Sequence, residues 1–373
     1  MRGCVVKKGK RYYVKYYFGG KQKWRAAGGS KREAERMLTD IVSRIHRGEY
    51  RELKSITFAE FADKWGKEHV EGGSLKPSTQ EFYRQILEHH LVPYFGGYEL
   101  AQITLEEVQG FVSVKLKGGK LSAQTINHLI TVLKGMSKHA VRWGYLRDNP
   151  ALYVERPRIP DKEMDFFTKE EIGKFLEHVP QNRYALFLTA IMTGLRQGEL
   201  LAMKWGNLDW NLGQYFVKES LYQGRFLEPK SRKSKRAIDL APTLLRELKQ
   251  HQVRQYEEKL QAGSNYQEFD LIFCTESGTP LDPKNLVKRG LNPALKAAGI
   301  RHIRFHDLRH TYTALLIDQG ESPKYIQNQL GHASIQTTLD RYGHLMPDTH
   351  REAAKRLDEA LFGRSSRKIV ENQ

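Results

Sequence analysis

The chain has 373 residues, and 61 Lys or Arg against 43 Asp or Glu give it a formal net charge of +18. Hydrophobic residues make up 39% and charged residues 28%, a globular balance that excludes a wholly disordered chain. No apolar run approaches the roughly 18 residues of a membrane span. The positive charge points to a polyanionic partner, nucleic acid first and an anionic membrane surface second.

Cysteine content and the first residues bear on the cellular compartment. Cys4 and Cys274 are the only cysteines, and two cannot form a disulfide framework. The N-terminal stretch is basic and lacks the apolar core of a signal peptide. We therefore expect a cytoplasmic protein without a membrane partner, divided into two or three domains at roughly 150 residues each.

Residues 1–32 mix basic and aromatic side chains and contain no acidic one. Gly19-Gly20 is a two-residue hairpin signal inside this run. A helix should follow, with Ser30 as N-cap and Glu33 as its capping-box partner. The expected buried face of that helix consists of Met37, Leu38, Ile41 and Ile45. The pattern predicts a strand–strand–helix module with a basic sheet face.

DNA contact is the function that this first module suggests. Its candidate DNA-binding residues are the basic side chains Lys7, Lys8, Lys10, Arg11, Lys15, Lys21, Lys23 and Arg25. A solvated charged tail is the alternative, but the interleaved tyrosines argue against it. A β-ribbon fits the major groove, so phosphate contacts and base readout are both expected.

Residues 56–155 are predicted to be purely helical. One apolar stripe runs through Phe58, Phe61, Ala62 and Trp65. A second helix is expected from Pro77 and carries Phe82, Ile86 and Leu91. A third should follow the capping box of Thr104 and Glu107, and a long one should begin after Ser122. No chemistry is visible here, so the segment is interpreted as a packing module whose surface lysines suit a DNA clamp.

A linker and a third domain follow. Residues 156–160 should be extended, because their prolines fix φ and bias the preceding residues away from helix. The third domain is expected to begin near Asp165, with two helical segments over 175–201 broken at Thr193-Gly194. Short strands are predicted at 215–217, 226–229 and 235–240, and helices after Pro242. The whole chain is therefore predicted to be multidomain α+β.

Two motifs in the third domain carry cations at turns. Glu199 lies three residues after Arg196, where it can brace the guanidinium or cap a helix. Taken alone, this is an ordinary glycine-rich helix entry. Lys230, Lys233 and Lys235 lie in a basic turn between two predicted strands, which by itself is typical of a solvated hairpin tip.

A third motif places His306, Arg309 and His310 at i, i+3 and i+4, on one face of a helix. Histidines four residues apart can ligate zinc. An arginine on the same face would repel the metal, Asp307 stands where a zinc protease has glutamate, and spacing reveals no third ligand. A cationic surface opposite an anionic oxygen fits these residues better.

The fourth motif contains His332 and, ten residues later, Tyr342. Each alone would be a cap or a packing residue. Together, the four motifs supply what phosphoryl transfer to a protein hydroxyl needs. Guanidinium groups match the equatorial oxygens of a phosphodiester transition state. Tyrosine has a pKa near 10 and needs a base or a cationic setting to attack, and a lysine can protonate the leaving alkoxide.

The ordered series R…K…HxxR…H…Y resembles the tyrosine recombinases of the phage-integrase family, and the resemblance covers most of the chain. It implies that Arg196 and Arg309 clamp the scissile phosphate, with Glu199 in support. It also implies that His306 and His332 hydrogen-bond the phosphate, and that His306 accepts the proton of the nucleophile.

The same resemblance makes Tyr342 the nucleophile, which forms a 3′-phosphotyrosyl link and releases a 5′-hydroxyl. It makes Lys230 the general acid, because Ser234, Arg236 and Ile238 follow it at the family's usual offsets. The energy of the broken bond stays in the ester, so no metal, ATP or other cofactor is expected. The motifs contain no carboxylate cluster for Mg²⁺.

The resemblance also implies a domain plan and partners. Residues 1–54 are similar to an arm-type DNA-binding domain, 56–155 to a helical core-binding (SAM-like) domain and 165–363 to the catalytic domain, with 364–373 as a tail. The expected function is integration and excision of a phage or mobile element. The expected partners are double-stranded attachment sites bound by a homotetramer, passing through a Holliday junction, with room for accessory directionality or DNA-bending proteins.

Two alternatives stay open at this point. A type IB topoisomerase-like enzyme shares the chemistry but needs no partner duplex. A DNA-binding architectural protein with a dead catalytic domain belongs to another class. The complete series of residues argues against this second alternative, since a decayed site should have lost at least one member.

Overall fold

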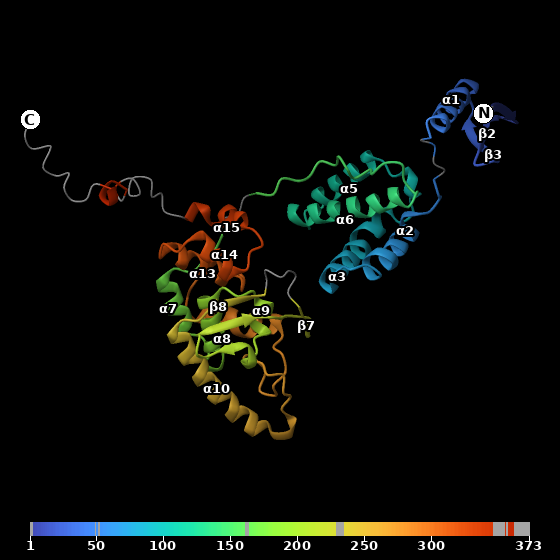
Figure 1. The fold of residues 1–373 in the computed structure, drawn as a ribbon. Coiled ribbons are helices and arrows are strands. Elements are labelled where there is room, and N and C mark those ends of the chain that lie inside the picture. The colour runs from blue at the N-terminus through green and yellow to red at the C-terminus, as the bar shows by residue number, and fades with distance from the viewer. Residues whose placement is uncertain are drawn as a thin grey trace, which may run out of the picture. The chain divides into compact units, whose positions relative to one another are not determined.

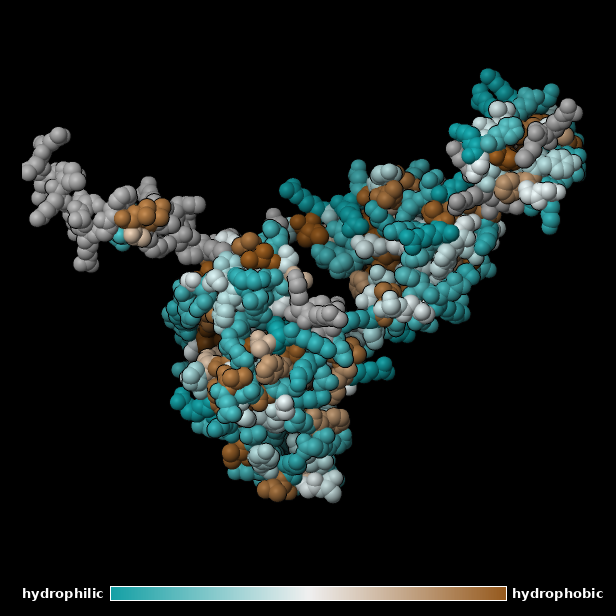
Figure 2. Space-filling view, in the orientation of Figure 1, coloured by the Kyte–Doolittle hydropathy of each residue, from teal (hydrophilic) through white to brown (hydrophobic). Residues whose placement is uncertain are grey.

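The computed structural model describes residues 3–48, 50, 53–160, 164–228, 235–345, 355 and 357–361. The chain forms two compact units, residues 1–161 and 162–373, and Figure 1 labels many of their elements. Over the part of the chain that is described, no helix combines the length and the apolar character needed to cross a bilayer. On the face seen in Figure 2 both units are mainly hydrophilic, with small separate hydrophobic patches.

The first unit begins with an antiparallel sheet followed by a helix. Its elements are β1 (Cys4–Lys8), β2 (Arg11–Phe18), β3 (Lys21–Gly28) and α1 (Lys31–His46). Gly19 and Gly20 form the predicted hairpin turn, with φ of 59° and 75° as a type I′ turn requires. Ser30 caps α1 by accepting a hydrogen bond from the Glu33 N–H at 3.5 Å. The expected residues of α1 pack against Val14 and Tyr16 of β2.

The sheet has one strand more than the predicted strand–strand–helix module. β1 pairs with β2 along its whole length, from Cys4 opposite Lys15 to Lys8 opposite Arg11. A five-residue run with two lysines has little apolar alternation of its own. Its strand conformation therefore depends on pairing with β2, which a local pattern does not reveal.

The described residues of 56–155 form helices joined by turns, as predicted. Its helices are α2 (Phe58–Trp65), α3 (Pro77–Ile86), α4 (Val92–Phe95), α5 (Leu105–Lys117) and α6 (Ala123–Arg142), with π-helical turns at Gly66–Glu71 and Leu87–Leu91. The Thr104–Glu107 capping box is present, and Ser122 caps α6. Phe82 is 38% exposed, whereas its neighbour Tyr83 stacks on Trp65, because Tyr83 lies about 100° further round α3.

The second unit is mainly helical around small antiparallel sheets. Its helices are α7 (Lys169–Glu177), α8 (Gln181–Thr193), α9 (Gln197–Leu201), α10 (Pro242–Ala262), α11 (Pro283–Leu286), α12 (Asn292–Ala297), α13 (Asp307–Asp318), α14 (Pro323–Leu330) and α15 (Ile335–Tyr342). The predicted break at Thr193-Gly194 separates α8 from α9. With the first unit's sheet and helices, this confirms the multidomain α+β class.

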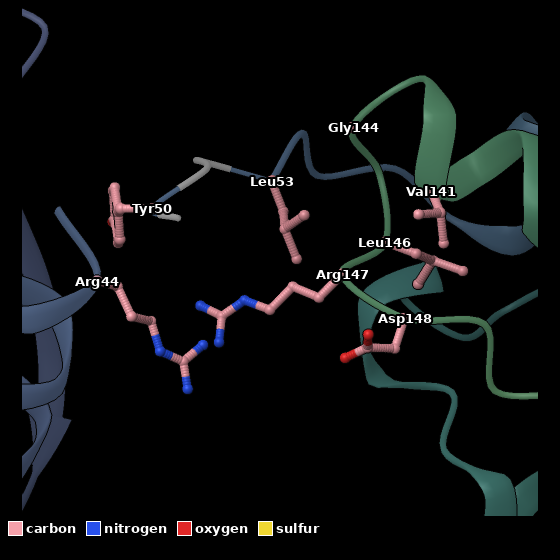
Figure 3. Close-up of a pocket in the computed structure, with 8 residues that line it drawn as sticks. All are labelled: Arg44, Tyr50, Leu53, Val141, Gly144, Leu146, Arg147 and Asp148. Atoms are coloured by element: carbon pink, nitrogen blue, oxygen red, sulfur yellow. The ribbon is translucent and has the colours of Figure 1, made fainter. Parts of the chain in front are cut away.

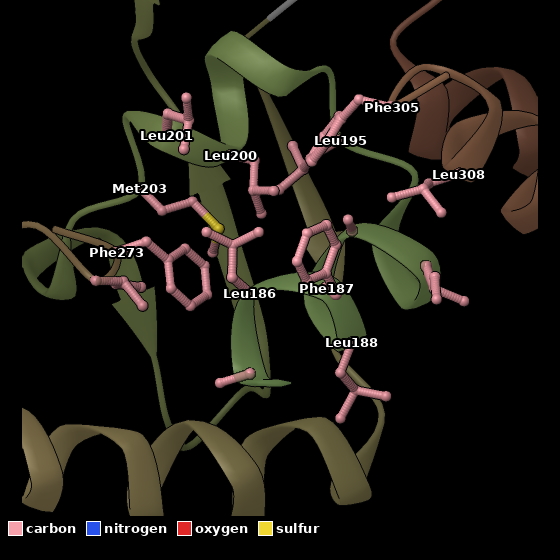
Figure 4. Packing of buried hydrophobic residues seen from close by; sticks show 14 of the residues in the cluster. Leu186, Phe187, Leu188, Leu195, Leu200, Leu201, Met203, Phe273, Phe305 and Leu308 are labelled. Carbon is pink, nitrogen blue, oxygen red and sulfur yellow. The ribbon is translucent and has the colours of Figure 1, made fainter. Parts of the chain in front are cut away.

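The strands described in the second unit form two separate sheets. β4 (Leu208–Asp209), β5 (Gln214–Val217) and β8 (Arg236–Asp239) make one, and β6 (Ser220–Tyr222) and β7 (Arg225–Leu227) make a hairpin of their own. The strand predicted at 226–229 thus ends earlier, at Leu227, and pairs with a strand that was not predicted. The core beneath these sheets holds Leu186, Phe187 and Leu200 (Figure 4), and it fixes α8 and α9 relative to the sheet that carries β8.

Candidate active site

Arg196 lies just after the tight turn that ends α8. Gly194 closes that helix with φ of 58°, and a Cβ there would lie 2.4 Å from Cδ1 of Tyr312. Glycine therefore allows the chain to turn against α13 and to start α9 at Arg196. The Arg196 N–H donates to Oε2 of Glu199 at 3.1 Å, and its Nη1 donates to Oε1 at 2.8 Å. The side chain of Arg196 is 41% exposed, so it is braced from within and open to solvent.

Glu199 is a buried carboxylate shared by two arginines. Besides Arg196, it accepts hydrogen bonds from Arg236, from Nη1 at 3.3 Å and from Nη2 at 3.0 Å. Burial by itself would raise the pKa of Glu199, but the charges of Arg236 and Arg196 outweigh it and lower the pKa to about 2. The carboxylate is therefore ionised at neutral pH. Glu199 therefore braces Arg196, and it also binds Arg236, to which the sequence analysis gave no role.

Arg309 lies on α13 and is 3% exposed. Its Nη1 donates to the Gly194 carbonyl at 2.7 Å, and its Nη2 donates to the Leu330 carbonyl at 2.6 Å. Burial, followed by the charge of Arg196, lowers the pKa of Arg309 to about 9, so the group is still cationic at neutral pH. The two carbonyls hold the guanidinium between the end of α8 and the end of α14.

His332 is positioned by the end of α14. Gly331 adopts φ of 64°, and the N–H groups of Gly331 and His332 bond to the Asn328 and Gln327 carbonyls at 3.1 and 3.2 Å, which is a Schellman motif. Nδ1 of His332 lies 2.9 Å from Oγ1 of Thr338. Burial, then the charges of nearby arginines, lower the pKa of His332 to about 3, so the ring is neutral at neutral pH.

Tyr342 ends α15 and is 1% exposed. Its hydroxyl lies 2.7 Å from Nδ1 of His310. Burial raises the pKa of Tyr342 above its usual value, although a hydrogen bond with Thr313 and the charge of Arg309 oppose this. The tyrosine is therefore neutral and held in the core. His310 is the residue that sequence reasoning left without a role, although its place directly after Arg309 and four residues after His306 was a signal.

His306 and Lys230 complete the predicted set. His306 is the exposed N-cap residue of α13, and its ring centroid is 5.0 Å from that of His310. Protein atoms around the ring and the charge of Arg309 lower the pKa of His306. Lys230 lies outside the described residues, as does Lys233. Among the residues that are described, no three His, Cys, Asp or Glu side chains gather as metal ligands do.

The basic residues predicted for the N-terminal sheet divide between its two faces. Directly paired residues of an antiparallel sheet share a face, so Lys23 and Arg25 lie on the side of Tyr16 and Val14, which is covered by α1. Lys8, Arg11 and Lys15 lie on the other side, with Tyr13, Tyr17 and Trp24. Nζ of Lys8 is 4.4 Å and Nζ of Lys15 is 5.7 Å from the Trp24 ring centroid. We call this second side the open face.

A pocket in the first unit contains none of the residues predicted for catalysis. It is lined by Arg44, Tyr50, Leu53, Val141, Gly144, Leu146, Arg147 and Asp148. Arg44 and Arg147 both extend into it (Figure 3), and Nε of Arg44 donates to Asp40 at 2.8 Å. The cationic residues of the predicted catalytic series therefore lie elsewhere, in the second unit.

Comparison with known proteins identifies the family and the fold. Residues 165–348 match the model of the phage integrase family, and residues 57–116 match that of the phage integrase N-terminal SAM-like domain. Among solved structures, a Tn1549 transposon integrase bound to circular intermediate DNA covers 80% of this chain, with a TM-score of 0.65 at 22% identity. A lambda integrase tetramer bound to a Holliday junction covers 91%, with a TM-score of 0.59 at 18% identity. These two likenesses establish the fold.

Sequence relatives extend the match to almost the whole chain. A tyrosine recombinase XerC-like protein of Caldanaerobacter subterraneus is 32% identical over 96% of this chain and 98% of its own length. The ICEBs1 integrase of Bacillus subtilis is 33% identical over 77% of this chain and 79% of its own length. From the family models and these relatives, the chain belongs to the phage integrase family of tyrosine recombinases.

Proposed function

We propose that this tyrosine recombinase is an integrase that cuts and rejoins double-stranded DNA at specific sites to integrate and excise a phage or mobile element. The observation that carries the proposal is the link that Arg309 makes between the turns that bear Arg196 and His332, since its guanidinium binds the Gly194 and Leu330 carbonyls. The ICEBs1 and Tn1549 relatives support the assignment to a mobile element.

The arginines and histidines bind the phosphate in this proposal. A phosphodiester gains negative charge as it becomes pentacovalent, and preorganised cations lower the energy of that state. Arg196 and Arg309 supply the charge, and Glu199 holds Arg196 in place. His332 and His306 hydrogen-bond the non-bridging oxygens.

Tyr342 is the proposed nucleophile. Its oxygen bonds to the phosphorus, the bond to the 5′ oxygen breaks, and a 3′-phosphotyrosyl ester forms. The tyrosine proton passes to a histidine, which the family resemblance makes His306, and Lys230 protonates the departing 5′ oxygen. Ligation reverses these steps. Because the hydroxyl is buried against His310 in the resting chain, the end of α15 must move before Tyr342 can reach DNA.

The domain plan and the assembly are also proposals. Residues 1–54 bind arm-type DNA, 56–155 bind the core site, and 165–363 perform the chemistry, with 364–373 as a tail. Four copies act on two duplexes through a Holliday junction, with accessory directionality or DNA-bending proteins. The lambda integrase tetramer on such a junction supports this assembly.

Strand exchange between two sites tests the function. The substrates are plasmids that carry the repeats flanking the integrated element. An integrase should yield recombinant products from two-site plasmids. Relaxation of supercoils without recombinants would favour the topoisomerase-like alternative, and binding without any covalent adduct would favour the architectural one.

Removal of residues 1–54 should spare cleavage of the core site and impair integration between full attachment sites. This segment holds sixteen basic and five acidic residues, a net charge of +11. The salt slope of DNA binding should fall by roughly 0.9 for every phosphate that the shortened protein no longer touches. Binding titrations across a range of salt concentrations measure that slope. An unchanged slope together with normal integration would contradict a DNA-binding arm.

The two faces of the sheet provide a matched comparison within this prediction. Alanine at Lys8, Arg11 and Lys15 removes three cations from the open face. Alanine at Lys21, Lys23 and Arg25 removes three from the face that packs on α1. The open-face variant should lose about 2.7 units of salt slope on arm-site DNA if all three residues contact phosphates, and the second variant should lose less. Equal losses of salt slope in the two variants would contradict preferential binding of DNA to the open face.

A further inference from the structure

We propose that Arg236 is a positioning residue for DNA cleavage. It holds Glu199 and the C-terminal turn of α14, so that Arg196 and His332 are presented to the same phosphate. The inference rests on the proposed function and adds a residue for which the phosphoryl-transfer chemistry has no direct use.

The contacts of Arg236 link three segments of the second unit. From β8, its Nε donates to the Gln329 carbonyl at 2.7 Å, and its two Nη atoms donate to the two oxygens of Glu199. Its side chain is 7% exposed, so it has little room to bind DNA itself. Arg236 thus joins β8 to the start of α9 and to the end of α14.

The charges explain why this link matters for Arg196. One buried carboxylate lies between two arginines, and Arg236 binds both of its oxygens. Arg196 keeps one side-chain bond to Glu199 and remains 41% exposed. Because Arg236 offsets most of the carboxylate's charge, the charge of Arg196 remains available for a phosphate. Without Arg236, both oxygens of Glu199 would pair with Arg196, and less of the charge of Arg196 would remain for the DNA.

The end of α14 is held by two guanidinium groups. Arg236 binds the Gln329 carbonyl, and Arg309 binds the next one, that of Leu330. Cations at the last carbonyls of a helix are favourable. A Cβ on Gly331 would lie 2.8 Å from Nη1 and 3.0 Å from Cδ of Arg236. Only glycine at position 331 leaves enough space for the Arg236 side chain. His332 is the next residue after this turn.

Lysine cannot reproduce these contacts. Its single ammonium is a point charge, whereas the guanidinium presents several donors in a fixed plane. Arg236→Lys would keep the positive charge, but it could not make the hydrogen bonds to both Glu199 oxygens and to the Gln329 carbonyl at the same time. The strand would still be docked, because Nε2 of Gln329 donates to Asp239 at 2.8 Å. The substitution therefore separates positioning from folding.

Single-turnover cleavage of a nicked suicide duplex is the test. We expect Arg236→Lys to form the covalent adduct about 10²-fold more slowly, as when a catalytic group is displaced by about 1 Å, with unchanged affinity for the site. The matched control is Arg254→Lys, which alters a partly buried arginine bonded to Glu247 at 2.8 Å within α10. It should cleave at the wild-type rate. A wild-type rate for folded Arg236→Lys would overturn the proposal.

A substrate with sulfur at the 5′-bridging position shows whether Arg236→Lys slows cleavage by displacing Arg196 or by impairing proton donation to the leaving group. Sulfur leaves without a general acid, so it rescues a defect in proton donation but not a displaced Arg196. Arg236→Lys should stay slow on this substrate. Full rescue would overturn the proposal, because it would mean that Arg236 acts through the lysine-bearing turn before β8.

Gly331→Ala provides a second variant, which keeps Arg236 but crowds it, and which also strains the left-handed backbone at this position. It should also cleave slowly with normal affinity, and the double variant should be slower than the wild type by less than the product of the two separate effects. If thermal melts show that Arg236→Lys does not fold, the cleavage rate of Gly331→Ala is the remaining test. A wild-type cleavage rate for Gly331→Ala would then overturn the proposal. Absence of any adduct from the wild-type chain would instead contradict the proposed function.

Discussion

Replacing Tyr342 with phenylalanine should abolish the covalent protein–DNA complex and leave site binding intact. The hydroxyl is the proposed nucleophile, and loss of a nucleophile costs on the order of 10⁶ in rate in a well-studied hydrolase. Binding depends on many separate cations, so it should persist. A denaturing gel with a nicked suicide duplex detects the adduct, and a gel shift measures the binding.

The control for this prediction is Tyr312→Phe. Tyr312 is a buried tyrosine that packs in the same hydrophobic cluster as Tyr342, and it should retain adduct formation. Tyr342→Phe keeps the ring and loses the hydrogen bond to His310 at 2.7 Å, a change of about 1 kcal/mol in unfolding free energy. A stable Tyr342→Phe protein that still forms the adduct would show that another residue is the nucleophile.

Lys230→Ala should slow cleavage of normal DNA by roughly 10²–10⁴, the usual contribution of a positioned proton donor. The same variant should recover on the substrate with a 5′-bridging sulfur, because that leaving group needs no proton. Arg196→Ala should be defective on both substrates, since it removes charge from the phosphate and not from the leaving group. Single-turnover rates on the two substrates measure this contrast.

The neighbouring lysines are the controls for this assignment. Lys235 is exposed and pairs with Glu228 at 3.3 Å, so Lys235→Ala should mainly weaken binding and its salt dependence. Lys233→Ala should behave in the same way. Sulfur rescue of either of these variants, without rescue of Lys230→Ala, would mean that the catalytic lysine has been assigned to the wrong position.

Local sequence determined much of the fold. Caps such as Thr104 with Glu107 join residues three positions apart, and the turn at Gly19-Gly20 needs only two residues that tolerate positive φ. The shared face of His306 and Arg309 follows from helical periodicity. The order of the catalytic motifs is itself a property of the sequence, so the family resemblance depends on the sequence alone.

Tertiary structure alone decided which distant groups meet. His310 reaches Tyr342 across 32 residues, and Arg236 reaches Glu199 across 37. The pairing of β1 with β2 decided which of the predicted arm cations share the open face. In α3, Tyr83 rather than Phe82 stacks on Trp65. Local patterns report the backbone conformation and the hydrophobic period of one segment. Contacts between segments depend on how helices and strands pack around a common core, and that packing is a property of the whole unit.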